Sequence, residues 1–208
     1  MMEITVDRYI DSQPFHTYYM TVSGHLLYTF TGNSMASKNK AFVENLPYSS
    51  NVRAYLATQV EFDRAMEYLL SRLRETGIAD KVLIAISADH YPFGFQPEEI
   101  NELAGYTVDS TFELYRSQFI LYVDGMEKPL VINKPVSSLD IIPTSANLMG
   151  LEFDSRLYMG HDLISDNQPL VIFVDRRSFI TEKGRYSSKS KTFYWDDGLR
   201  KMRHTRRT

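Results

Sequence analysis

The residues best suited to chemistry are an acid and a histidine that stand side by side, Asp89 and His90. They follow the run KVLIAIS (81–87), which is apolar on both alternating faces and is typical of a central strand covered on both sides. Such a strand holds the residues that follow it in a fixed position. A turn after the strand lets two neighbouring side chains point to the same side instead of opposite faces. A carboxylate and a neutral imidazole are oxygen and nitrogen ligands suited to Mn²⁺, Zn²⁺ or Mg²⁺.

A third candidate, His25, follows the stretch QPFHTYYMTVS (13–23), whose aromatic and β-branched residues predict another strand. In open α/β sheets, ligands bind beyond the carboxyl ends of the strands, where we expect His25 and the Asp89–His90 pair to lie together. Two ligands do not complete a catalytic metal site, which normally takes three or more from the protein. For an arbitrary Asp-His pair, a turn cap at Asp89 and a local hydrogen bond at His90 are the favoured interpretation.

The elements that position these residues alternate between helix and strand. From Asn51 to Arg74, apolar residues recur at intervals of three, four and seven, which predicts a long amphipathic helix. A shorter helix is expected in QPEEINELAG (96–105), which has proline at its first position and glycine just beyond its end. SSLDIIPTSANLMG (137–150) predicts a third helix with Pro143 in its first turn.

We therefore expect an α/β fold with a mainly parallel sheet flanked by helices. Its predicted strands are segments 15–23, 82–88, 117–123 and 170–175. The short runs after residue 175 predict a small C-terminal antiparallel meander, followed by a basic tail at 196–208. We find no internal repeat and no interdomain linker, so residues 1–208 are expected to belong to a single domain.

The amino-acid composition excludes several kinds of site and segment. The chain has 208 residues, a net charge of −3 and no cysteine, which excludes disulfides, thiolate metal sites and a cysteine nucleophile within it. The charge gives no bias toward nucleic acid. No segment reaches the roughly 20 apolar residues that a membrane helix needs, and the N-terminal MMEITVDRYI is too polar for a secretory signal.

Several longer stretches resemble the sulfatase and alkaline-phosphatase-like superfamily. Residues 55–91, YLATQVEFDRAMEYLLSRLRETGIADKVLIAISADHY, resemble its long helix and the strand that ends in a metal-binding Asp-His. KPVSSLDIIPTSANLMGL (134–151) resembles its Pro-Thr helix, and YMGHDLIS (158–165) resembles its Gly-x-Asp-Leu element. Within the superfamily, the chain is most similar to the lipoteichoic acid synthase branch, where YYMTVSGHLLY (18–28) matches a strand ending in a substrate-contacting histidine. The resemblance covers nearly all of residues 15–182.

This resemblance implies an alkaline-phosphatase-like fold and a metal-dependent transfer of glycerol phosphate through a covalent phosphothreonine. Asp89 and His90 would bind the divalent metal, with Mn²⁺ favoured over Mg²⁺ or Zn²⁺, and His25 would bind the substrate. The family's threonine nucleophile and first acidic ligand match no segment here, so no catalytic nucleophile is expected in this chain and the chain alone is expected to be inactive. Residues 1–208 would then be the C-terminal portion of the catalytic domain.

The implied partner is a phosphoglycerol lipid or polymer at the bacterial cell surface, outside the cytoplasmic membrane, with membrane contact only through segments upstream. No nucleic-acid partner is expected. Because a partial sheet leaves an open edge or a bare apolar face, we expect a homodimer through the exposed sheet surface, or aggregation. Four alternatives stay open: a sulfatase, a phosphoethanolamine transferase (disfavoured because that branch usually relies on disulfides), a non-catalytic remnant, and a module that binds anionic polymer through the basic tail.

Overall fold

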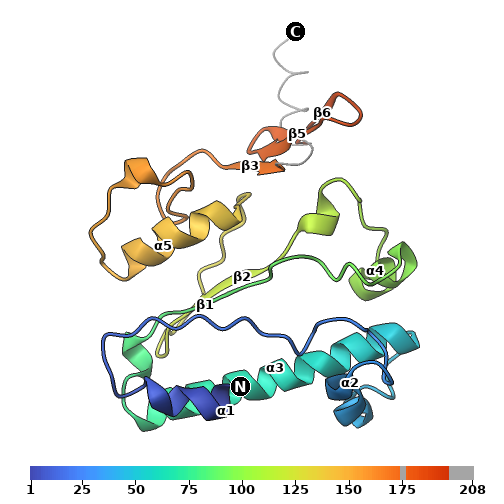
Figure 1. The fold of residues 1–208 in the computed structure, drawn as a ribbon. Coiled ribbons are helices and arrows are strands. Elements are labelled where there is room, and N and C mark those ends of the chain that lie inside the picture. Colours follow the sequence, from blue (N-terminus) through green and yellow to red (C-terminus); the bar gives the residue numbers. More distant parts are fainter. Residues whose placement is uncertain (174–176, 197–208) are drawn as a thin grey trace. The chain divides into compact units, whose positions relative to one another are not determined.

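The fold is that of a computed structural model, which describes residues 1–173 and 177–196 (Figure 1). The chain divides into two compact units, Met1–Gly125 and Met126–Thr208, and each is described by itself. The helices are α1 (Met2–Thr5), α2 (Ser34–Lys38), α3 (Ser50–Glu75), α4 (Pro97–Ala104) and α5 (Ile141–Leu148). The strands are β1 (Ile84–Ser87), β2 (Phe119–Tyr122), β3 (Leu170–Phe173), β4 (Ser178–Thr181), β5 (Gly184–Ser187) and β6 (Thr192–Trp195).

The long helix α3 organises the first unit. Its 26 residues confirm the helix predicted over 51–74, and its C-terminal half buries Leu69 and Leu73. These side chains pack against Val6 and Ile10 of the N-terminal segment, which follows α1. Burying a large apolar side chain contributes about 2 kcal/mol, so this face holds the N-terminal segment on α3.

The N-terminal half of α3 packs against the short helix α2 through small side chains. Ala36 of α2 and both Ala54 and Ala57 of α3 are fully buried. Side chains of this size let the two helix backbones approach closely. Asn33 caps α2 by accepting a hydrogen bond from the Met35 backbone N–H at 2.9 Å, which supplies the orphan donor of a helix start with a partner.

Strands β1 and β2 form a two-stranded antiparallel sheet in which Ile84 pairs with Tyr122. Arg74, near the end of α3, donates two hydrogen bonds to Asp124, at 2.7 and 3.1 Å. The Tyr122 hydroxyl donates a third at 2.6 Å. These bonds, led by those from Arg74, lower the pKa of Asp124 to about 2. The end of α3 is thereby joined to the residues just beyond β2.

The prediction that segments 15–23, 82–88, 117–123 and 170–175 share one mainly parallel sheet is wrong in its strand pairing. Among the described residues, β1 pairs with β2 and β3 with β4, both antiparallel, and segment 15–23 forms no strand. Burial alternates along β1, and the residues on its exposed side are small, Ala85 and Ser87. An apolar run indicates which side chains tend to be buried. It does not indicate whether the neighbouring strand is parallel or antiparallel. The last two residues of 170–175 lie outside the described part of the chain.

Helix α4 confirms the helix predicted after the Asp89–His90 pair. Pro97 is its first residue, and Gly105 ends it with a φ of 78°, a left-handed conformation that favours glycine. At its start, the Glu99 carboxylate accepts a hydrogen bond from the Gln96 backbone N–H at 2.8 Å. The loop that follows β1 is therefore fixed at its far end by a capped helix.

In the second unit, β3 to β6 form an antiparallel meander in sequence order, as the sequence predicts. Phe179, Tyr186 and Phe193 are successive cross-strand partners, and the rings of Phe179 and Tyr186 stack with centroids 5.3 Å apart. This row supports aromatic packing within the sheet. The predicted basic tail, 196–208, lies outside the described residues except for Asp196.

Candidate metal centre

Asp89 and His90 follow the end of β1 at Ser87 and lie in a turn, as the sequence predicts. The His90 backbone N–H donates to Asp89 Oδ1 at 2.9 Å. The His90 ring nitrogen Nδ1 lies 2.7 Å from the Tyr91 carbonyl oxygen. A carbonyl oxygen only accepts, so Nδ1 carries the hydrogen. The turn therefore orients both side chains through backbone groups of the next two residues.

In the neutral ring, the hydrogen on Nδ1 leaves a lone pair on His90 Nε2 that is available to bind a metal ion. Metal-binding histidines commonly donate their second ring N–H to a carbonyl or carboxylate in this way. Nε2 lies 3.5 Å from Asp89 Oδ2. Two ligands about 2.1 Å from one tetrahedral ion are about 3.4 Å apart, so this pair is spaced as two ligands of one metal would be.

Both side chains are open to the surroundings, with 83% of Asp89 and 44% of His90 exposed. No group of three or more histidine, cysteine, aspartate or glutamate side chains is placed to hold a metal among the described residues. The oxygen and nitrogen donors of Asp89 and His90, and the distance between them, fit a divalent cation bound by two protein ligands. An ion held by two exposed ligands is bound weakly.

His25 lies in a second loop of the same unit and is exposed. Its backbone N–H donates to the Val22 carbonyl at 3.1 Å, which closes a turn. The Asn33 side chain donates to the His25 carbonyl at 3.0 Å, tying the turn to the start of α2. The backbone of the loop is fixed in this way, and the exposed imidazole lies with Nδ1 3.3 Å from the Leu26 carbonyl oxygen.

The loops that carry His25 and the Asp89–His90 pair meet at a cluster of three aromatic rings. Tyr28 lies 4.7 Å from Phe95 and 5.1 Å from Tyr55 of α3, between ring centroids. Burial raises the pKa of Tyr28, and the charges of Tyr55 and Asp89 raise it further. Tyr28 and Phe95 are both buried. The two loops thus belong to one packed region, and convergence of the three candidate side chains on one cleft stays a prediction.

The sequence reasoning did not identify Tyr28 and Phe95 as residues that position the site. They are 67 positions apart, and no local pattern indicates that two aromatic side chains so distant in sequence pack together. The position of Phe95, immediately before a helix start, is the single sequence feature that relates it to the candidate ligands.

In the second unit, the two family-like segments around Asp140 and Asp162 are joined by hydrogen bonds. The buried Asp140 carboxylate accepts from the backbone N–H groups of Ser137 and His161, both at 2.8 Å. The Thr144 hydroxyl donates to the Asp140 carbonyl at 2.6 Å and accepts from the Leu163 N–H at 2.9 Å. Thr144 is 1% exposed, so its hydroxyl has a structural role in joining the two segments.

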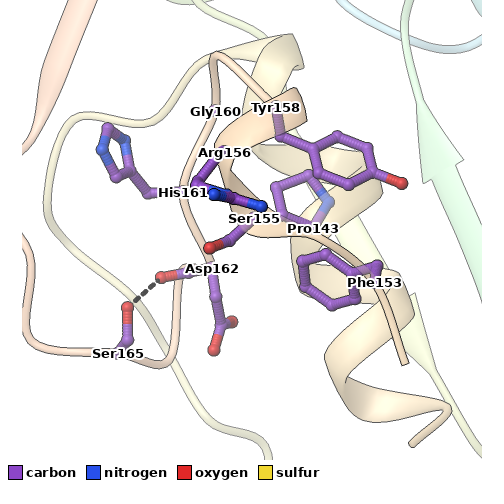
Figure 2. A pocket seen from close by; sticks show the side chains of 9 residues that line it. All are labelled: Pro143, Phe153, Ser155, Arg156, Tyr158, Gly160, His161, Asp162 and Ser165. Carbon is purple, nitrogen blue, oxygen red and sulfur yellow. Dashed lines mark hydrogen bonds between the residues drawn. The ribbon is translucent and has the colours of Figure 1, made fainter. Parts of the chain in front are cut away.

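A surface pocket of about 440 Å³ lies beside this junction (Figure 2). The Phe153 and Tyr158 rings are perpendicular, with centroids 5.2 Å apart, and His161 is exposed. Arg156 is bound to Asp154 in a salt bridge of 2.6 Å, and the Asp162 carboxylate accepts from the Asn147 side chain at 2.9 Å. The charged groups at the pocket are therefore already paired, which fits a structural role for this surface.

A sequence comparison determines the family. The family model described as Sulfatase matches residues 5–151, well over half of the chain. The chain belongs to the sulfatase family. This match includes α3, β1, the candidate metal pair and α5.

Individual relatives show which branch of the sulfatase family this chain resembles. It is 23% identical over 185 residues to the lipoteichoic acid synthase-like YvgJ of Bacillus subtilis, covering 86% of this chain and 29% of the relative. It is 26% identical over 176 residues to a lipoteichoic acid synthase of Staphylococcus aureus strain USA300, covering 83% of this chain and 26% of the relative. The chain thus spans less than a third of the curated relatives' length, and its resemblance to this branch is confirmed.

A solved structure has the same fold. The lipoteichoic acid synthase LtaP from Listeria monocytogenes matches with a TM-score of 0.65 at 21% identity, over 89% of this chain and 46% of that one. The expected alkaline-phosphatase-like α/β class is confirmed by this match. None of the helices in the described residues is long and apolar enough to cross a membrane.

Proposed function

We propose that this chain is part of a metal-dependent phosphoglycerol transferase of the lipoteichoic acid synthase type, acting on a glycerol-phosphate lipid or polymer at the bacterial cell surface. The observation that carries the proposal is the Asp89–His90 pair, whose Oδ2 and Nε2 are 3.5 Å apart in a sulfatase-family fold. The names of the similar proteins support the substrate class. The family resemblance favours Mn²⁺ as the metal, ahead of Mg²⁺ and Zn²⁺.

Each residue of the proposed site has a distinct task. Asp89 and His90 hold the cation, which supplies a positive charge that stabilises negative charge on phosphoryl oxygens. The hydrogen bond from His90 Nδ1–H to the Tyr91 carbonyl selects the neutral tautomer in which Nε2 has the lone pair. His25 donates a hydrogen bond to a phosphate oxygen or to the leaving glycerol oxygen. The exposed position of its ring suits contact with a substrate.

We further propose that the chain alone is a weak metal binder and a poor enzyme. Within the described residues the candidate metal pair has no third histidine, cysteine or acidic ligand, and an incomplete coordination shell loses affinity. The threonine nucleophile that the family resemblance implies has no counterpart in the matched motifs. Turnover of a phosphatidylglycerol analogue by this polypeptide alone would contradict this part of the proposal.

The function is tested by binding of glycerol 1-phosphate to the Mn²⁺-loaded chain, followed by ³¹P relaxation. Bound paramagnetic Mn²⁺ relaxes a nearby phosphorus nucleus, so we expect faster relaxation with the chain than with the same concentration of Mn²⁺ alone. The enhancement should disappear in Asp89→Ala and should weaken in His25→Gln. His16→Gln, which alters an exposed histidine of the same unit, is the matched control and should keep the enhancement.

A sulfatase is the second candidate, because the matching family carries that description. A small sulfate ester added as competitor distinguishes the two substrates. Failure of the ester to displace glycerol phosphate supports the transferase, whereas displacement at a lower concentration of ester favours a sulfatase. No enhancement by the parent chain, with its fold intact by circular dichroism, would contradict both and favour a non-catalytic remnant.

We also propose that the first unit self-associates through its exposed apolar surface. Tyr18, Met20 and Val22 are 77%, 67% and 67% exposed on an extended segment, and Ile120 of β2 is 48% exposed. The two-stranded sheet of β1 and β2 leaves one edge of each strand without a strand partner in the described chain. Such edges and patches favour pairing with a second copy.

Sedimentation at micromolar concentration tests this association. We expect a dimer, or larger species, for the parent chain. Replacing Met20 and Val22 by lysine should shift the population toward monomer, because a buried interface does not accept unpaired charges. A clean monomer with a cooperative melt at high temperature would contradict the proposed association.

A further inference from the structure

Gly94 lies where the loop that follows Asp89 and His90 contacts the loop that carries His25. A Cβ atom added to this residue would be 1.9 Å from Leu26 Cδ2, 3.3 Å from Leu26 Cγ and 3.0 Å from the Tyr28 ring. Separations below about 3 Å are not tolerated between carbon atoms. Leu26 follows His25 directly, and Gly94 is four residues beyond His90. A side chain at position 94 would therefore require the end of the Leu26 side chain to shift or the two loops to separate.

The side of the contact formed by Tyr28 has little freedom to move. Its ring is 6% exposed and packs against both Tyr55 and Phe95. Tyr55 and Phe95 also contact each other, with ring centroids 5.3 Å apart. A group added at position 94 is thus opposed by a ring that two others hold in place. It must displace the Leu26 side chain or move one loop away from the other.

We propose that Gly94 is a positioning residue that holds the His25 loop against the Asp89–His90 loop. It acts through Leu26 and Tyr28, and it sets the distance from the substrate-binding histidine to the metal pair. This inference rests on the proposed function, because the distance matters to catalysis only if His25 binds the substrate and Asp89 and His90 bind the metal. The contact itself is a property of the fold and is tested separately from metal binding.

The test measures the distance between the two loops with a nitroxide instead of a metal. The chain has no cysteine, so Asp89→Cys gives a single site for the label, and the side chain there is 83% exposed. The label relaxes the His25 ring protons, identified by their loss in His25→Gln, with a strength that falls as the sixth power of distance. We expect strong relaxation in the labelled parent, a several-fold fall with Gly94→Ala, and a larger fall with Gly94→Val.

A compensating substitution separates loop spacing from general loss of stability. Leu26→Ala removes the atoms nearest to the added Cβ, so Gly94→Ala combined with Leu26→Ala should recover most of the relaxation. Gly105→Ala is the matched control. That glycine ends α4 with a φ of 78° and has no atom within 4 Å of an added Cβ, so its replacement strains the backbone without touching the loops. It should leave relaxation at His25 unchanged.

Unchanged relaxation in Gly94→Ala and Gly94→Val would overturn the inference. So would a fall that Leu26→Ala does not reverse, or an equal fall in Gly105→Ala. Mn²⁺ titration of the unlabelled parent is a separate experiment. Absence of Mn²⁺ binding there would contradict the proposed function, whereas the nitroxide result would still decide the role of Gly94.

Discussion

Replacing Asp89 or His90 by alanine is expected to weaken Mn²⁺ binding by about tenfold or more, because each change removes one of two protein ligands. The measurement is a titration followed by the electron paramagnetic resonance signal of free Mn²⁺. Affinity should be lost in both variants to a similar degree, since neither Oδ2 of Asp89 nor Nε2 of His90 has a substitute among the described residues.

Controls for this titration come from the same unit. Asp11→Ala and His16→Ala each remove an exposed side chain of the same type and should leave the affinity unchanged. Equal affinity in the parent, Asp89→Ala and His90→Ala would place the metal elsewhere and remove the basis of the proposed site.

Replacing Gly160 by alanine is expected to cause a large loss of stability in the second unit. An added Cβ would lie 2.0 Å from the Leu139 carbonyl oxygen and 2.7 Å from the Asp140 backbone nitrogen, and backbone atoms cannot rotate away. Residues 160–163 must then move off the start of α5. That breaks the bonds from His161 to Asp140 and from Leu163 to Thr144. A buried polar group left without its partner costs about 1–3 kcal/mol, so the two together predict a loss of about 2–6 kcal/mol.

Urea unfolding measures the loss of stability in Gly160→Ala, and amide exchange at Leu163 shows whether the junction has opened. Gly150→Ala is the control, since that glycine has a φ of 64° but no atom within 4 Å of an added Cβ. Its replacement should cost about 1 kcal/mol through left-handed backbone strain alone. Equal losses for Gly150→Ala and Gly160→Ala, with the Leu163 amide still protected, would show that the Gly160 contact is not essential.

The elements that the sequence predicts correctly depend on local signals. Helix α3 follows from an apolar period over 24 residues that the structure extends by one residue at each end. Helix α4 follows from Pro97 at its start and Gly105 at its end. The position of Asp89 and His90 beyond a strand follows from the apolar run that precedes them. Each signal lies within the element it predicts.

The features that the sequence does not predict depend on partners far along the chain. The direction of β1 relative to β2 is set by pairing with residues 119–122, and segment 15–23 has strand-like composition without a strand neighbour in the described residues. Asp140 stands at the start of α5, yet its carboxylate accepts a hydrogen bond from a backbone group 21 residues away. The proton on His90 Nδ1 is fixed by a backbone carbonyl, which every residue type supplies. No local residue pattern predicts the strand direction, the long-range hydrogen bond of Asp140 or the tautomer of His90.

The central claim, that His90 and Asp89 together hold a divalent cation, is tested most directly by pulsed electron paramagnetic resonance of Mn²⁺ bound to the chain. An imidazole nitrogen that coordinates Mn²⁺ produces a measurable hyperfine coupling. We predict this coupling in the parent chain and in His25→Gln, and its loss in His90→Gln under conditions where Mn²⁺ is still bound. Bound Mn²⁺ without nitrogen coupling in the parent, or with a coupling that survives in His90→Gln, would contradict the claim.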